Sequence, residues 1–165
     1  MFVPFKTLPD SARVWIYQSN RAFKPEEVNA ISMALHAFTN SWAAHNQPLK
    51  ASFQVLHNYF IVLAVDEAHH EASGCSIDSS VHVIRQLGLQ TGIDFFERTN
   101  VPLLLDEKVH LIKLPELKQA HENGVWNSRT TVFDNTVLTK GDFDKRWKSP
   151  AGETWLKRYL SKAAV

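Results

Sequence analysis

The strongest chemical signal in the chain is its single cysteine, Cys75, together with the histidines that precede it. The run Ser73-Gly74-Cys75 is typical of a tight turn that opens a helix, and the amide groups and dipole at a helix N-terminus favour a thiolate. A catalytic thiol needs a nearby base, and His69 and His70 are the best placed of the eight histidines. The alternative is that Cys75 is an inert residue packed under the turn.

Polar residues at the ends of two predicted strands indicate a site for a small anion. The candidate ligand-binding residues are Asn20, Arg21, Asp66, Glu67, Ser73, Ser76 and Asp78. In a ferredoxin-like sheet we expect the first and third strands to be parallel neighbours, which would bring Arg21 beside Asp66 and Glu67. Arginine and helix N-terminal amides together form a recurrent anion site. The alternative is an ion pair between Arg21 and one of the two acids that only braces the loops.

Several other kinds of site lack necessary residues. Apolar runs end in acids at Asp66-Glu67 and Asp106-Glu107, as in a Walker B strand, but the six glycines never stand in the G-x-x-x-x-G-K-[S/T] spacing that binds phosphates. The C-x5-R loop of cysteine phosphatases is absent because residue 81 is Val81. The acids and histidines from Asp66 to Glu71 lack H-E-x-x-H spacing, so we expect no metal and no other cofactor.

Four short segments carry a resemblance to a known family. They are W-I-Y-Q-S-N-R at 15–21, W-A-A-H at 42–45, S-G-C-S-I-D-S-S at 73–80 and V-F-D-N at 132–135. They resemble an uncharacterised bacterial protein family, and the likeness covers nearly the whole chain. Its members are often labelled "ABC transporter ATPase". Because this sequence lacks both the phosphate-binding loop and an L-S-G-G-Q-type signature, ABC-type ATPase activity is disfavoured, and the resemblance implies no established activity.

Hydrophobic periodicity predicts an α+β fold with a mainly antiparallel sheet. Strands are expected at 13–19, 51–56 and 60–65, with a turn at 57–59. Apolar residues at three- and four-residue spacing predict helices from Pro25 to Trp42 and from Ser76 to Leu87, both on one face of the sheet. This order is most of a ferredoxin-like split βαβ unit, and its fourth strand would come from 103–105 or 109–112.

The second half of the chain is expected to contain a hairpin and helices. Asp134-Asn135 separates two strand-like runs, which predicts a hairpin with a two-residue turn. Helices are expected at 142–148 and 153–160. The 165 residues are therefore interpreted as a single domain, 1–165, with a ferredoxin-like βαββα half at 1–92 and the hairpin and helices at 93–165.

Composition narrows the class of protein. A hydrophobic content of 44% and a net charge of +1 favour a globular chain and disfavour a nucleic-acid partner, which calls for a basic excess. The chain shows no signal peptide and no membrane span, so we expect a cytoplasmic protein without a membrane partner. The segment Lys145–Lys162 is basic and contains Trp155 and Tyr159, as a nucleic-acid surface would. The favoured interpretation is an amphipathic helix docked by its aromatic residues.

Two functional hypotheses follow. The first is binding of a small anionic ligand, or thiol-dependent catalysis, at the strand ends near Cys75. The alternative is a non-catalytic interaction protein or homodimer, which the lack of a complete catalytic motif and the aromatic content of 11% favour.

Overall fold

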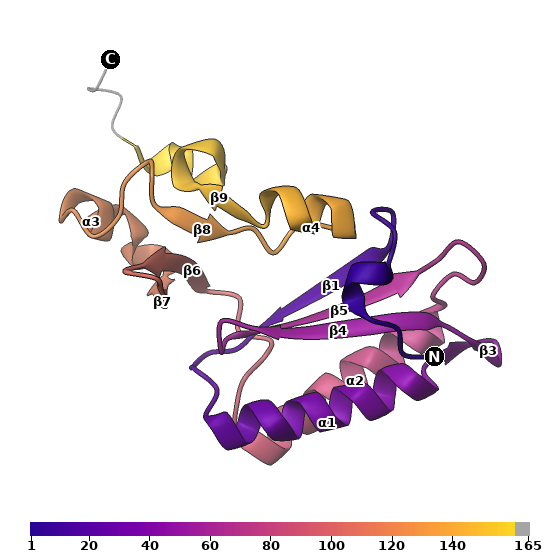
Figure 1. Cartoon of the computed structure of the whole chain (residues 1–165). Coiled ribbons are helices and arrows are strands. Elements are labelled where there is room, and N and C mark those ends of the chain that lie inside the picture. Colours follow the sequence, from indigo (N-terminus) through magenta and orange to yellow (C-terminus); the bar gives the residue numbers. More distant parts are fainter. Residues whose placement is uncertain (161–165) are drawn as a thin grey trace. The chain divides into compact units, whose positions relative to one another are not determined.

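The computed structural model describes residues 1–160 and groups them into two compact units (Figure 1). Unit 1 contains Met1–Glu97 and Val137–Asp144, and unit 2 contains Arg98–Thr136 and the described residues from Lys145 onward. Each unit has a hydrophobic core of its own. The fold is α+β with antiparallel sheets, as predicted.

A three-stranded antiparallel sheet is the framework of unit 1. Its strands are β1 (Arg13–Gln18), β4 (Lys50–Leu56) and β5 (Phe60–Asp66), in the order β1-β5-β4. Every residue from Phe60 to Val65 is buried, which explains why this central strand is an unbroken apolar run. A short hairpin of β2 (Ala43–Ala44) and β3 (Gln47–Pro48) precedes β4, and a 3-10 turn, Phe5–Thr7, precedes β1.

The direction of β5 corrects the sequence prediction. β1 and β5 are neighbours, as expected, but they are antiparallel, since Arg13 pairs with Val65 and Gln18 with Phe60. The physical reason is the tight turn after Leu56, which forces β5 to run opposite to β4, while the helical crossover before β4 leaves β4 parallel to β1. This arrangement is compatible with a split βαβ, ferredoxin-like unit.

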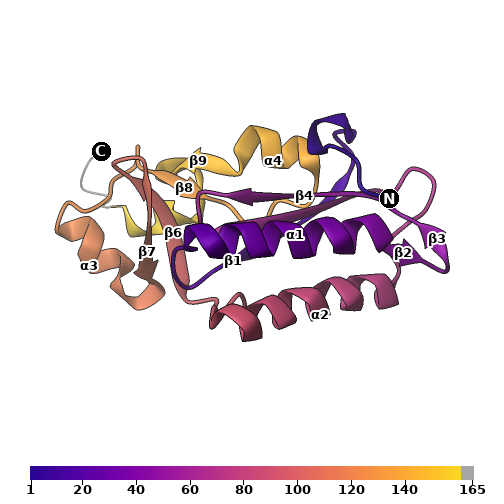
Figure 2. The same cartoon turned by 60° about the horizontal axis from the view of Figure 1, so that its bottom comes forward.

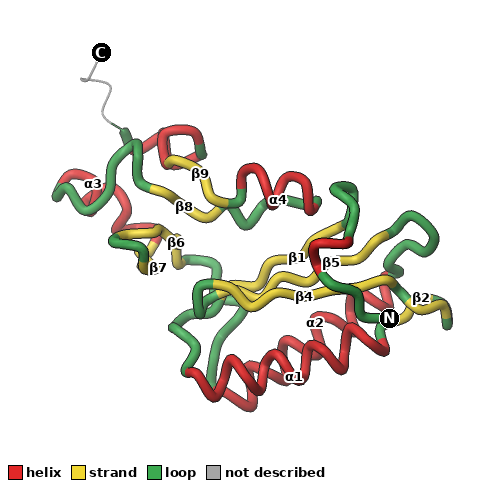
Figure 3. Tube along the Cα trace, in the orientation of Figure 1, coloured by secondary structure: helices red, strands yellow, loops and turns green. Residues whose placement is uncertain are grey.

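Two helices cover one face of this sheet, as predicted (Figures 1 and 3). α1 (Pro25–Ser41) and α2 (Gly74–Thr91) lie side by side (Figure 2) and send their apolar faces into the same core. Pro25 occupies the first helical position of α1, and Gly92, with a φ of 72°, ends α2 in the left-handed conformation that glycine adopts without strain.

The sheet edge beside β1 is taken by a segment from much later in the chain. The amide of Val14 donates to the carbonyl oxygen of Leu138 over 2.9 Å, and Arg13 forms an antiparallel bridge with Thr139. The hairpin predicted across Asp134-Asn135 is therefore wrong, because the residues after this turn pair with β1. Local strand propensity cannot specify a pairing partner so far away in sequence.

A four-stranded antiparallel sheet forms unit 2. Its strands are β6 (Asn100–Leu105), β7 (Lys108–Lys113), β8 (Thr131–Phe133) and β9 (Lys148–Pro150), in the order β7-β6-β8-β9. The two runs predicted as alternative fourth strands of the first sheet thus pair with each other, across the two-residue turn Asp106-Glu107. Both turn residues have positive φ, 49° and 62°, which suits the twist of a hairpin.

The helices of unit 2 are short. They are the 3-10 turns Leu114–Glu116, Ala151–Glu153 and Trp155–Tyr159, the helix α3 (Leu117–Glu122), and the last residues of α4 (Lys140–Arg146), which begins in unit 1. The single helix predicted at 153–160 is replaced by the last two 3-10 turns. Leu156 is fully buried there, but Trp155 is 46% exposed, so docking through both aromatic residues is only partly correct.

Candidate functional site

The structure separates Arg21 and Asn20 from the acids that they were predicted to join. Because β1 and β5 are antiparallel, the end of β1 lies beside the start of β5. Arg21 donates to both carboxylate oxygens of Glu27 over 2.8 Å and to the carbonyl of Thr91 over 2.8 Å. Asn20 accepts from the amide of Asp94 over 2.9 Å. The predicted position of Arg21 beside Asp66 and Glu67 is therefore wrong, since its guanidinium joins the start of α1 to the end of α2.

Asp66 and Glu67 bond to the loop that they begin. Asp66 Oδ1 accepts from the amide of Ala68 over 3.0 Å, and Glu67 Oε1 accepts from the amide of Ala72 over 3.2 Å. Glu67 also lies 3.7 Å from the guanidinium of Arg13. The predicted ion pair of Arg21 with Asp66 or Glu67 is therefore wrong, because Arg13 lies beside Glu67 and Arg21 pairs with Glu27.

The first turn of α2 is fixed by serines and by a tryptophan. Ser73 is the N-cap, and its Oγ accepts from the amide of Ser76 over 3.2 Å. Ser76 is buried, and its carbonyl accepts from the indole N–H of Trp42 over 2.9 Å. Ser76 therefore has a structural role, while Ser73 lines the pocket described below. Asp78 is exposed and lies on a different surface, the groove between α1 and α2.

Cys75 is exposed at the second position of α2. Its exposure contradicts the interpretation of an inert residue packed under the turn. Its carbonyl accepts from Ser79 Oγ over 3.0 Å, and the catalytic role predicted for the thiol with His69 and His70 stays a prediction.

The pocket at this end of unit 1 contains His69 and His70 and adds His45. It encloses about 350 Å³. His45 and Gln47 contribute from the β2–β3 hairpin, residues 69–72 from the loop before α2, and Ser73 from the N-cap. Three histidines thus line the same pocket as Ser73, the N-cap of α2.

His45 is the site residue that sequence reasoning missed. In the sequence it follows the helix predicted from Pro25 to Trp42, but the chain turns back after α1. His45 and Asn46 form the two-residue turn of the β2–β3 hairpin, with φ of 50° and 63°. The next strand, β4, starts with Lys50, which pairs with Asp66. Asn46 was an available signal, because asparagine tolerates the left-handed conformation of such turns.

A smaller hollow of about 210 Å³ adjoins the same histidines. Met1, Pro48, Lys50 and Asp66 line it together with His69 and His70. The amine of Met1 donates to the carbonyl of Leu49 over 2.8 Å, and burial lowers the pKa of this amine below its usual value. Lys50 and the Met1 amine therefore add basic groups beside the histidine pocket.

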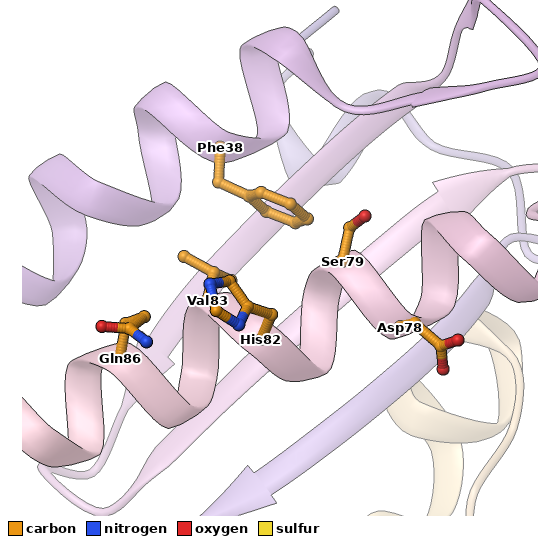
Figure 4. Close-up of a pocket in the computed structure, with 6 residues that line it drawn as sticks. All are labelled: Phe38, Asp78, Ser79, His82, Val83 and Gln86. Atoms are coloured by element: carbon orange, nitrogen blue, oxygen red, sulfur yellow. The ribbon is translucent and has the colours of Figure 1, made fainter.

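A third cavity, of about 530 Å³, follows the groove between the two helices. Figure 4 shows Phe38 reaching from α1 toward Ser79 and Val83 of α2. His82, Gln86 and Asp78 complete the lining. Phe38 and Val83 supply the apolar part of this lining, and Ser79 Oγ donates to the carbonyl of Cys75 over 3.0 Å.

The comparisons with known proteins assign no family to this site. Neither a family model, nor a curated protein, nor a solved structure matches the chain. The resemblance to an uncharacterised bacterial family therefore stays a prediction. In the described part of the chain, no group of three or more His, Cys, Asp and Glu side chains could hold a metal ion, and no helix is both long and apolar enough to cross a bilayer.

The ion pair between Arg21 and Glu27 predicts how stability depends on pH. Hydrogen bonds from Arg21 hold the pKa of Glu27 at about 2, below its ordinary 4.5. A lowered carboxyl pKa contributes stability that is fully present above pH 4.5 and is lost as the pH falls through about 2. We therefore expect Glu27→Gln to be less stable than the wild type near neutral pH and to lose this deficit on acidification. Urea unfolding across this pH range measures the difference, and a deficit that does not change with pH would contradict the prediction.

Replacing the exposed thiol is expected to have little effect on folding. We expect Cys75→Ser to change the free energy of unfolding by no more than about 0.5 kcal/mol, because the side chain is at the surface. Ser76→Ala is the matched control one residue away. It removes the hydrogen bond from Ser76 Oγ to the carbonyl of Ser73 and should cost about 1 kcal/mol. Thermal melts of both variants provide the measurement. A larger loss of stability in Cys75→Ser than in Ser76→Ala would contradict the surface position of Cys75.

Proposed function

We propose that this protein binds a small anion, such as the phosphate or carboxylate group of a metabolite, in the pocket formed by His45, His69, His70 and Ser73. The observation that carries the proposal is that three histidines from two separate segments line one cavity at the N-terminus of an 18-residue helix. Thiol catalysis is not part of the proposal, because His69 and His70 line this pocket and Cys75 is not among its lining residues.

The backbone at the start of α2 supports this assignment. The first amides of a helix have no acceptor within the helix, and the helix dipole favours negative charge at that end. A Cβ atom added at Gly74 would meet nothing within 4 Å, so a ligand could approach the backbone closely at this point. The pocket volume lies near the lower end of the range for small-molecule sites, ~300–1,000 Å³.

One acidic side chain also lines the pocket. Glu71 would oppose a bound anion, so the proposed site depends on the histidines and on the N-terminus of α2 to outweigh it.

The proposal is tested by titrating inorganic phosphate while recording the imidazole resonances of the protein. We expect His45, His69 and His70 to shift together, and His69→Ala or His70→Ala to weaken binding by about tenfold, as loss of a charged hydrogen bond does. His57→Ala is the matched control, because His57 lies in the turn between β4 and β5, at the other end of the sheet. No shift at the three pocket histidines, or equal affinity in the pocket variants and the control, would overturn the proposal.

A second candidate function is association through the groove between α1 and α2. The observation that favours it is the apolar lining around Phe38 and Val83 (Figure 4). Light scattering of the wild type and of Phe38→Asp tests self-association, and a monomer at high concentration in both would remove this candidate.

A further inference from the structure

The net charge of the chain conceals an uneven distribution between its two units. The described residues of unit 2 include ten Lys and Arg against six Asp and Glu, whereas unit 1 has seven against eleven. Lys162 lies outside the described residues. The whole-chain charge of +1 argued against a nucleic-acid partner, but unit 2 alone has the basic excess that such a partner requires.

Trp155 is the tryptophan that unit 2 presents to solvent. It is 46% exposed, whereas Trp42, Trp126 and Trp147 are buried. Its ring contacts Tyr159 at 6.1 Å between centroids, and Tyr159 contacts the fully buried Trp126 at 6.4 Å. The exposed indole therefore packs on rings that extend into the core of unit 2. Because this packing holds the Trp155 side chain in place, little conformational entropy is lost when a ligand binds to it.

Basic side chains lie in the same part of unit 2. Lys157 and Arg158 are exposed on the same 3-10 turn, and the Arg158 guanidinium lies 5.8 Å from the centroid of Tyr159. Arg129 is brought to this segment from an earlier loop, because the amide of Gly152 donates to the carbonyl of Ser128 over 2.9 Å. Basic side chains from two separate segments therefore lie in the part of unit 2 that contains Trp155.

We propose that the surface of unit 2 around Trp155 binds single-stranded nucleic acid. A base stacks on Trp155, and the adjacent phosphates bind Lys157, Arg158 and Arg129. Single strands are favoured over duplexes because only an unpaired base offers its face to an aromatic side chain. An acidic peptide would form ion pairs with these cations, but it has no base to stack on the indole of Trp155. This inference does not depend on the histidine pocket, which belongs to unit 1.

Fluorescence anisotropy of a labelled oligothymidine, titrated with the full chain at low salt, tests the proposal. We expect binding that weakens as salt rises, and we expect Trp155→Ala to reduce the affinity by about fivefold to a hundredfold while Trp155→Phe retains most of it. Lys157→Ala should also lower the slope of log affinity against log salt by about 0.7, the value for one phosphate of a single strand. Lys6→Ala, an exposed cation of unit 1, is the matched control and should change neither quantity.

Two results would overturn the inference. One is the absence of oligothymidine binding at low salt. The other is binding of polyglutamate as tight as that of oligothymidine, with no effect of Trp155→Ala, which would show attraction by charge alone. Circular dichroism melts confirm that the variants are folded, and Arg158→Ala provides a second surface variant if Trp155→Ala melts early.

Discussion

Replacement of Trp42 by alanine is expected to lower the free energy of unfolding of unit 1 by about 3–5 kcal/mol, the usual cost of deleting a buried tryptophan side chain. Trp42 is 2% exposed, and its ring lies 4.9 Å from that of Phe38 and 5.7 Å from that of Trp15. Its indole N–H also holds the first turn of α2 through the carbonyl of Ser76. The substitution should therefore weaken phosphate binding as well, because this turn forms one wall of the histidine pocket.

Trp42→Phe separates the two contributions. It keeps an aromatic ring in the core but removes the hydrogen bond to Ser76, which should account for about 1 kcal/mol. Denaturant unfolding and phosphate titration of both variants provide the measurements. A loss below about 1 kcal/mol in Trp42→Ala would mean that the core closes around the cavity or that the ring is not packed as described.

Replacement of Trp126 by alanine is expected to have an effect of similar size on unit 2, about 3–5 kcal/mol. The indole is 1% exposed and donates to the carbonyl of Leu117 over 2.9 Å, and its ring lies 4.8 Å from that of His121. Hydrogen exchange of the β6 and β8 amides measures the loss of protection. Trp155→Ala is the matched control in the same unit, and a similar loss of protection there would contradict the surface position of Trp155.

Local sequence signals predicted the helices and the buried strand of unit 1 well. Periodic apolar residues located α1 and α2 within a few residues of their observed ends, and Pro25 is the first residue of α1 in both the prediction and the structure. The apolar run from Phe60 to Val65 correctly indicated a central strand. These signals succeed because helix caps, helix periodicity and the burial of both faces of a strand all depend on residues that are close together in the sequence.

The partners across the sheet could not be predicted in the same way. Arg21 and Asp66 were joined by assuming parallel strands, but one tight turn decides the direction of β5 and places them at opposite ends of the sheet. His45 was missed for a related reason, since its position depends on how the chain returns after α1. For the candidate pocket, the sequence therefore identified His69, His70 and Ser73, which are close together in the chain, but not the histidine that approaches from another segment.

The late pairing of Leu138 with β1 has a consequence during synthesis on the ribosome. Once Glu97 has been made, α1, α2 and all three strands of the first sheet are available, yet the outer edge of β1 stays uncovered until the ribosome has added Arg98–Thr136 and then Leu138. An uncovered strand edge is a template for pairing with another chain. A nascent or prematurely terminated product that stops before Val137 should therefore aggregate more readily than the full-length protein, even though it contains the histidine pocket.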